Sequence, residues 1–110
     1  DFQNHKKKIQ KTKSIDLHGY TLEEANKIIE KFLSNSYEKK IQKILVITGK
    51  GIHSETENDP YVSKNLSKLK YSIPYFLKNN QNLKNIILEI KEANIEDGGS
   101  GAFYIYLKKK

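Results

Sequence analysis

Residues 14–51 read SIDLHGYTLEEANKIIEKFLSNSYEKKIQKILVITGKG, and this stretch decides the fold class. Polar and apolar residues alternate over residues 14–18, which is typical of a short strand. Thr21, with a Glu three residues later, matches a capping box, and apolar residues then recur at helical spacing to about Tyr37. The aliphatic run 44–47 predicts a buried central strand. The stretch therefore predicts a parallel β-α-β unit with a right-handed crossover.

The rest of the chain predicts one more helix and two more strands. Asp59 and Pro60 offer a helix start, and apolar residues then repeat at intervals of four and three as far as Pro74, which should end or kink the helix. Further elements follow in order: a short extra turn at 75–77, a loop at 79–82, a strand at 86–91, a glycine-rich connector at 98–101 and a strand at 102–107. The connector is too short for a crossover helix, so the last two strands should pair antiparallel. The expected α/β fold is βαβαββ, a four-stranded mixed sheet with two helices on one face.

Strand alternation separates a helix-facing set of side chains from an open-face set. The helix-facing set comprises Ile15, Leu17, Ile86, Leu88, Ile90, Phe103, Ile105 and Leu107, and the open-face set comprises Asp16, His18, Glu89, Lys91, Tyr104 and Tyr106. On the open face the tyrosine rings could stack on bases and the lysine could contact phosphate. The alternative is a solvated polar face on which the rings pack across strands.

Length and charge define the class of partner. The 110 residues fit one domain, which we assign to residues 14–110, behind a basic tail at residues 1–13. The tail is either a passive flexible arm or a polyphosphate-binding arm. All 20 basic residues are Lys and the net charge is +7, which favours polyanions, with nucleic acid ahead of an anionic membrane surface.

The absence of Cys, of an apolar run of about 20 residues and of a signal-like N-terminus fits a cytoplasmic protein without membrane spans.

Two short motifs could carry chemistry. Asp16 and His18 place a carboxylate and an imidazole at the end of the first strand, where they could act in acid–base catalysis or bind a divalent metal such as Mg²⁺ or Mn²⁺. The alternative is an Asp that caps the turn and a His bonded to backbone. Gly49, Lys50 and Gly51 follow the buried strand, where backbone amides and a lysine could hold a phosphate, although the loop is not a Walker A motif.

These motifs together resemble the Smr (small MutS-related) domain, of the stand-alone bacterial type. Four segments carry the resemblance over about residues 14–110: DLHGYT at 16–21, LVITGKG at 45–51, the helix end IPYFL at 73–77, and GGSGAFYIYL at 98–107. The resemblance implies a sandwich similar to the C-terminal domain of bacterial translation initiation factor three. It also implies nucleic-acid binding and, for several members, DNA-nicking or RNA-cleaving endonuclease activity, with roles in DNA repair or RNA processing.

The resemblance assigns roles to individual residues. Asp16 and His18 match the residues associated with cleavage, and Gly49, Lys50 and Gly51 match the loop associated with nucleic-acid contact. Lys70, Gly99, Gly101 and Tyr104 are the further residues that we expect to bind nucleic acid.

Three positions depart from the family pattern. Thr48 stands where many members have His, Lys70 stands where Arg is usual, and Asp97 stands where His is frequent. Lys70 lacks the bidentate fork of Arg, and Asp97 brings negative charge towards a phosphate site. The alternatives to an endonuclease are therefore a non-catalytic module that binds DNA, RNA or the ribosome, and a protein-interaction domain with incidental charge. The sequence indicates no oligomeric state.

Overall fold

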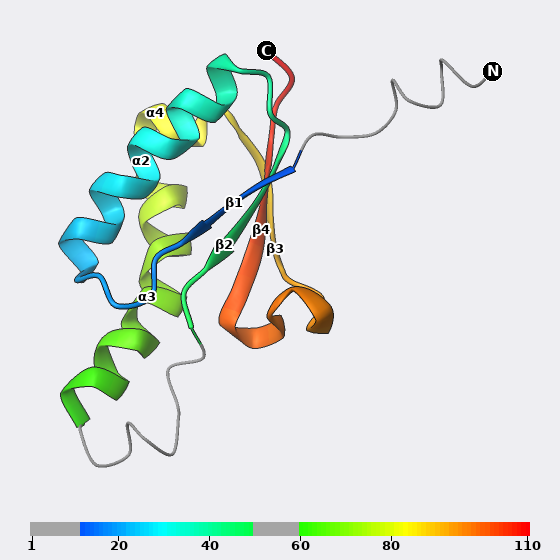
Figure 1. The fold of residues 1–110 in the computed structure, drawn as a ribbon. Helices are drawn as coiled ribbons and strands as arrows, with labels where there is room; N and C mark the ends of the chain where they lie inside the picture. The colour runs from blue at the N-terminus through cyan, green and yellow to red at the C-terminus, as the bar shows by residue number, and fades with distance from the viewer. Residues whose placement is uncertain (1–11, 50–59) are drawn as a thin grey trace.

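The computed structural model describes residues 12–49 and 60–110, without the side chains of residues 60–68. Four strands form one sheet in the order β1-β2-β4-β3, with bounds Thr12–Asp16 for β1, Lys43–Ile47 for β2, Ala102–Leu107 for β4 and Ile87–Glu92 for β3. β1 and β2 are parallel, and β4 is antiparallel to both of its neighbours. The helices α2 (Leu22–Glu38), α3 (Pro60–Asn79) and α4 (Gln81–Lys84) lie on one side of the sheet in Figure 1. The predicted mixed sheet with helices on one face is confirmed.

Both ends of α2 are closed by local hydrogen bonds. The Thr21 hydroxyl accepts from the Glu24 amide at 3.2 Å, and the Glu24 carboxylate accepts from the Thr21 amide at 3.0 Å, which completes the predicted capping box. At the other end, Lys40 adopts a left-handed conformation with φ 63°, and the Ile41 amide donates back to the Ser36 carbonyl at 2.9 Å. A lysine therefore occupies a left-handed position in which glycine is the usual residue.

Pro74 lies inside α3, so of the two expected effects, an end or a kink, it does not end the helix. Leu69, Ile73 and Leu77 recur on one face on both sides of the proline and are buried in the core, which holds the helix on its course to Asn79. Residues 79–82 do not form the expected loop either. Asn80 accepts a hydrogen bond from the Leu83 amide at 3.0 Å and thereby starts α4, a helix that the sequence pattern did not predict.

The core lies between the helices and the sheet. Leu17, Ile44, Val46, Ile105 and Leu107 are buried there from the sheet side, at the positions that strand alternation predicts. A second, smaller apolar cluster covers part of the opposite face of the sheet and consists of Ala93, Ala102 and Tyr104, with Leu45, Ile47 and Tyr106 packed against it. The face that the sequence pattern left open is therefore partly closed.

Leu88 breaks the alternation expected of β3. Its side chain is 67% exposed, whereas Ile87 and Ile90 both pack on the main core. The pairing of β3 with β4 shifts register between Ile87 and Glu89, so one extra residue is accommodated in β3. Such a bulge turns the following side chains to the other face of the sheet. The expectation that Ile86, Leu88 and Ile90 form one inward set is therefore wrong.

The described part of the chain begins inside the region assigned to the basic tail. β1 starts at Thr12, two residues before the expected strand, and residues 1–11 lie outside the described residues. Over residues 12–49 and 60–110, no helix is long and apolar enough to cross a membrane.

Candidate functional site

Three segments distant in sequence meet at the end of the sheet where β1 and β2 finish. The Leu17 amide donates to the Ile47 carbonyl at 2.7 Å, and the Thr48 amide donates to the Gly101 carbonyl at 2.9 Å. In the sheet register, Asp16 is the partner of Ile47, and Ile47 is the partner of Ala102. The fold therefore brings the Asp16–His18 segment, the end of β2 and the glycine-rich segment together at one end of the sheet. This end, where β1 and β2 finish, is called the sheet edge below.

Asp16 and His18 form a direct pair on the surface. The His18 Nδ1 atom lies 2.6 Å from Asp16 Oδ1, and the same oxygen accepts the His18 backbone amide at 3.0 Å. The side chains are 49% exposed for Asp16 and 64% exposed for His18. A carboxylate at Nδ1 calls for a proton on that nitrogen, which leaves Nε2 of a neutral ring as the proton acceptor. Asp16 thus caps the turn and also orients the imidazole.

Thr48 is a structural residue rather than a phosphate ligand. Its side chain is fully buried, and its hydroxyl lies within hydrogen-bonding distance of the carbonyls of Gly49 and Gly101, at 3.3 and 3.4 Å. Gly49 has φ 85°, and its amide also donates to the Gly101 carbonyl, at 3.0 Å. The Gly49 amide is therefore already used inside the protein. Lys50 and Gly51, the rest of the predicted phosphate loop, lie outside the described residues.

The glycine-rich segment uses its amides internally. Asn94 and Gly98 supply carbonyls to the amides of Gly99 and Gly101, both at 2.9 Å, within the two 3₁₀ turns η1 (Ile95–Asp97) and η2 (Gly99–Gly101). Gly101 is also buried. In this conformation the amides of Gly99 and Gly101 are not free to bind phosphate, which differs from the expectation. The segment instead supplies the carbonyl that holds the end of β2.

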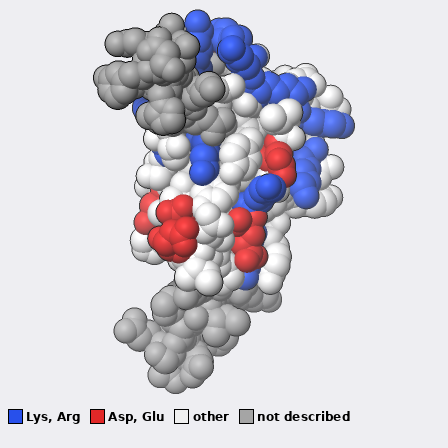
Figure 2. Space-filling model, turned by 90° about the vertical axis from the view of Figure 1, so that its right-hand side faces the viewer, with Lys and Arg blue, Asp and Glu red and all other residues white. Residues whose placement is uncertain are grey.

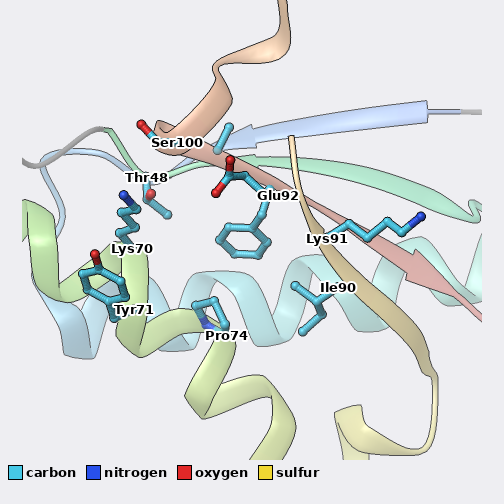
Figure 3. Close-up of a pocket in the computed structure, with 10 residues that line it drawn as sticks. Thr48, Lys70, Tyr71, Pro74, Ile90, Lys91, Glu92 and Ser100 are labelled. Carbon is cyan, nitrogen blue, oxygen red and sulfur yellow. The ribbon is translucent and has the colours of Figure 1, made fainter. Parts of the chain in front are cut away.

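Lys70 lies at a pocket beside this edge. The pocket has a volume of about 200 Å³ and is formed between α3 and the sheet by Thr48, Lys70, Tyr71, Pro74, Ile90, Lys91, Glu92, Ser100, Ala102 and Phe103. In Figure 3 the Lys70 amino group points toward Thr48, whereas the Lys91 side chain extends away from the other labelled residues. Lys70 therefore lies beside the joined strand ends, as its expected role requires. Glu92 adds a carboxylate to the same pocket.

Tyr104 is not on an open face, so that expectation is wrong. The residue is 5% exposed, and its hydroxyl donates to Asp97 Oδ2 at 2.5 Å and accepts from the Asn94 amide at 3.2 Å. The hydrogen bond to the Asp97 carboxylate raises the pKa of Tyr104 above its ordinary value of 10.0. The Lys43 amino group lies 4.4 Å from the ring centre. A ring enclosed in this way does not stack on a base.

The open face of the sheet is not uniformly basic. Figure 2 shows lysines over much of the upper part of this face, with acidic groups both among them and lower down. Lys91, expected to meet phosphate there, lies 3.7 Å from the Glu89 carboxylate. A polyanion crossing this face would meet both signs of charge.

No group of three or more His, Asp or Glu side chains that could hold a metal ion occurs within residues 12–49 and 60–110. Asp16 and His18 therefore supply two donors, fewer than a dedicated metal site formed by protein alone. Mg²⁺ can instead bind through a single carboxylate together with substrate phosphates, and the exposed Asp16 suits that mode.

Sequence reasoning missed Tyr71 and Tyr75. The sequence pattern predicts only a short extra turn at 75–77 and no role for Tyr71, but Tyr75 is 71% exposed and Tyr71 is 68% exposed. The helical spacing of these residues is the signal that could have identified the two tyrosines as exposed. Both tyrosines lie opposite the stripe of Leu69, Ile73 and Leu77, provided that the helix continues through Pro74.

The comparisons with known proteins identify a family and similar folds. The Smr domain profile matches residues 15–108. Among solved structures, the Smr domain of Thermus thermophilus MutS2 is similar, with a TM-score of 0.67 and 20% identity over 87% of this chain and 98% of that one. YdaL, a stand-alone small MutS-related protein from Escherichia coli, has a TM-score of 0.61 and 20% identity over 87% of this chain and 64% of that one. No curated protein matches the sequence.

Proposed function

This chain belongs to the Smr domain family, and from that premise we propose that it binds nucleic acid and cleaves it at the sheet edge where β1 and β2 end. The observation that carries the proposal is the meeting of three segments there: the Asp16–His18 pair, the end of β2 and the glycine-rich segment. The family is known for nucleic-acid binding and nuclease activity. The net charge of +7 favours a polyanionic partner.

The proposed chemistry rests on the pair. His18 Nε2 accepts the proton of an attacking oxygen, either water or a ribose 2′-hydroxyl, as that oxygen bonds to phosphorus. The P–O bond to the leaving ribose oxygen breaks, and that oxygen takes up a proton from water. Asp16 holds the ring at Nδ1 and stabilises its positive charge. The Asp16 carboxylate is the group that would hold a divalent cation, which would supply further stabilisation of negative charge. Lys70 and Lys50 are the proposed phosphate contacts. The position of Lys70 beside Thr48 at the joined strand ends supports its assignment as a phosphate contact.

The test is cleavage of supercoiled plasmid and of single-stranded and structured RNA, each with and without Mg²⁺ or Mn²⁺. His18→Ala should lower cleavage about 100-fold or more, because general acid–base catalysis contributes about that much. Asp16→Asn is the informative second variant, since it keeps an oxygen that can accept the His18 amide but removes the charge. Both variants should bind the substrate as the unaltered protein does.

Two outcomes would contradict the cleavage proposal. One is that the unaltered protein cuts neither substrate under any metal condition. The other is that His18→Ala cuts as fast as the unaltered protein, which would locate the activity elsewhere.

A second candidate is a non-catalytic module that binds DNA, RNA or the ribosome. One observation favours it: Thr48, in the place where many family members have His, is fully buried and directed at two carbonyls, so it offers nothing to a phosphate. This candidate predicts salt-sensitive binding without turnover. This candidate is supported if the His18→Ala variant still binds nucleic acid and neither the variant nor the unaltered protein cleaves it.

A further inference from the structure

The outer face of α3 carries two exposed aromatic rings on a helix whose other face is buried. Tyr71 is 68% exposed and Tyr75 is 71% exposed, whereas Leu69, Ile73 and Leu77 are at most 1% exposed. Residues four apart on a helix are neighbours, about 5–6 Å apart between Cβ atoms. The two rings therefore form one surface, called here the tyrosine platform. An outer helix face is ordinarily polar, so this pair is unusual.

Lysines flank the tyrosine platform. The Lys70 amino group lies 5.4 Å from the centre of the Tyr71 ring, and the exposed Lys78 follows Tyr75 by three residues on the same face of the helix. Within α3, the stretch from residue 69 to 79 contains no Asp or Glu. The carboxylates that share pockets with Lys70 and Lys78 are Glu92 and Glu89, and both belong to β3. On the helix itself, the tyrosine platform thus combines flat rings with lysines, while the neighbouring carboxylates lie on the sheet side.

The tyrosine platform adjoins the proposed cleavage edge. Tyr71 and Lys70 line the same pocket as Thr48 and Ser100, which belong to the joined strand ends. Figure 3 shows Lys70 and Tyr71 projecting from one stretch of α3 beside Thr48. On the other side, Tyr75 lines a second pocket between α2 and α3, whose neutral polar side chains include Asn26 and Ser72. A strand held at the edge could continue from the first pocket over both rings.

We infer that the tyrosine platform binds unpaired nucleotides, so that the preferred substrate of the proposed function is single-stranded RNA or DNA. Exposed aromatic rings interleaved with cations are the combination that binds single strands, because bases stack on the rings and phosphates meet the charges. In a duplex the bases are stacked on one another, so no base face is available to stack on the tyrosine rings. This inference rests on the proposed function, since it identifies the substrate class of the same site.

The test compares single-stranded and duplex probes with the full chain. Fluorescein-labelled 20-nucleotide DNA and RNA single strands, and duplexes of the same sequence, are titrated and followed by fluorescence anisotropy. The variants are Tyr71→Ala/Tyr75→Ala, Tyr71→Phe/Tyr75→Phe, and a matched control, Leu88→Ala/Ile95→Ala, which removes two exposed apolar side chains elsewhere. Circular dichroism checks that each variant is folded.

The alanine pair should weaken single-strand binding about tenfold or more, because stacking contributes about a factor of ten per base. Its duplex binding should change less than about twofold, since phosphate contacts carry that term. The phenylalanine pair keeps the rings and should bind like the unaltered protein, as should the control.

The inference is overturned if the alanine pair binds single strands as tightly as the unaltered protein, or loses single-strand and duplex binding equally. Either result leaves the proposed function standing. If the unaltered protein binds no probe, the proposed function and the tyrosine platform both fall. The His18→Ala variant separates the two further, since it should lose cleavage while it keeps its preference for single strands.

Discussion

Asp16 uses one oxygen atom both to close a turn and to contact the His18 ring of the proposed catalytic pair. Oδ1 accepts the His18 backbone amide, which closes the turn after β1, and also contacts the imidazole at Nδ1. The turn capping and the catalytic pair that the sequence left as alternatives are therefore compatible. An alanine at position 16 would change both properties together, and this is why the asparagine variant is the cleaner probe of charge.

Gly98 should be the least replaceable glycine of the glycine-rich segment. It has φ 117°, and a Cβ there would lie 2.9 Å from the Ala102 Cβ, which is anchored on β4. Gly98→Ala should lower the free energy of unfolding by about 3 kcal/mol. Gly99→Ala is the control, because Gly99 has φ 51° with open space around it and should lose about 1 kcal/mol. Urea denaturation measures both, and equal losses would contradict this account.

The Tyr104–Asp97 hydrogen bond should make stability fall in alkali. Because the bond raises the pKa of Tyr104, the folded protein keeps the phenol proton at pH values where the unfolded chain loses it. This contribution is complete below pH 10 and is lost as pH rises beyond 10. The urea midpoint of the unaltered protein should therefore fall above pH 10 more steeply than that of Asp97→Asn, in which the charged acceptor is absent. Parallel curves for the two proteins would argue against this bond.

At the level of elements, α2 shows how local chemistry fixes a boundary. The Thr21 capping box was readable from the sequence because it depends on two residues three apart and on nothing else in the fold. The C-terminal end, expected at about Tyr37, lies at Glu38, but the way in which the chain leaves the helix was not predicted, because no glycine marks it. The chain turns at Lys40 in a left-handed conformation that lysine adopts only at a cost.

Lys40→Gly should therefore stabilise the protein. Glycine adopts a φ of 63° without steric cost, so the free energy of unfolding should rise by about 1 kcal/mol. Lys39→Gly is the matched control, because Lys39 has φ −87° and gains nothing from glycine. Thermal or urea unfolding distinguishes the two. A loss of stability in Lys40→Gly would show that the lysine side chain contributes more than the strained backbone costs.

Over the whole molecule, charge and shape point to the α3 side rather than the open sheet face. The open face mixes acidic and basic groups, and its central Tyr104 is buried. The outer face of α3 presents Lys70, Tyr71, Tyr75 and Lys78, with no acidic residue between them on the helix. A polyanion should follow this helix face, on which lysines are the only charged side chains within residues 69–79.

Nucleic-acid binding should accordingly depend on salt, and Lys70 should account for part of that dependence. The logarithm of the binding constant should fall linearly with the logarithm of salt concentration, and Lys70→Ala should reduce that slope by about 1. Lys91→Ala is the control, because Lys91 is already near Glu89 and points away from the pocket. Anisotropy titrations between about 0.05 and 0.2 M salt measure the slopes. Equal slopes for Lys70→Ala and the unaltered protein would remove Lys70 from the site.

The sequence by itself determined the β-α-β unit, the four strands, the capping box and the family. Each depends on a repeat of two residues along a strand, three or four along a helix, or a short motif, and such patterns are complete within a few neighbouring residues. For the same reason Asp16 and His18 could be proposed as a pair, since they are two positions apart on one turn.

Only the tertiary structure decided which side chains and amides are available at the site. Tyr104 is covered by the segment at residues 93–97, the amides of Gly99 and Gly101 are used within their own turns, and the bulge at Leu88 shifts one strand against its neighbour. The continuation of α3 through Pro74 depends on burial of Ile73 and Leu77, and it exposes Tyr71 and Tyr75. Exposure depends on what distant segments cover, and a local pattern carries no information about that.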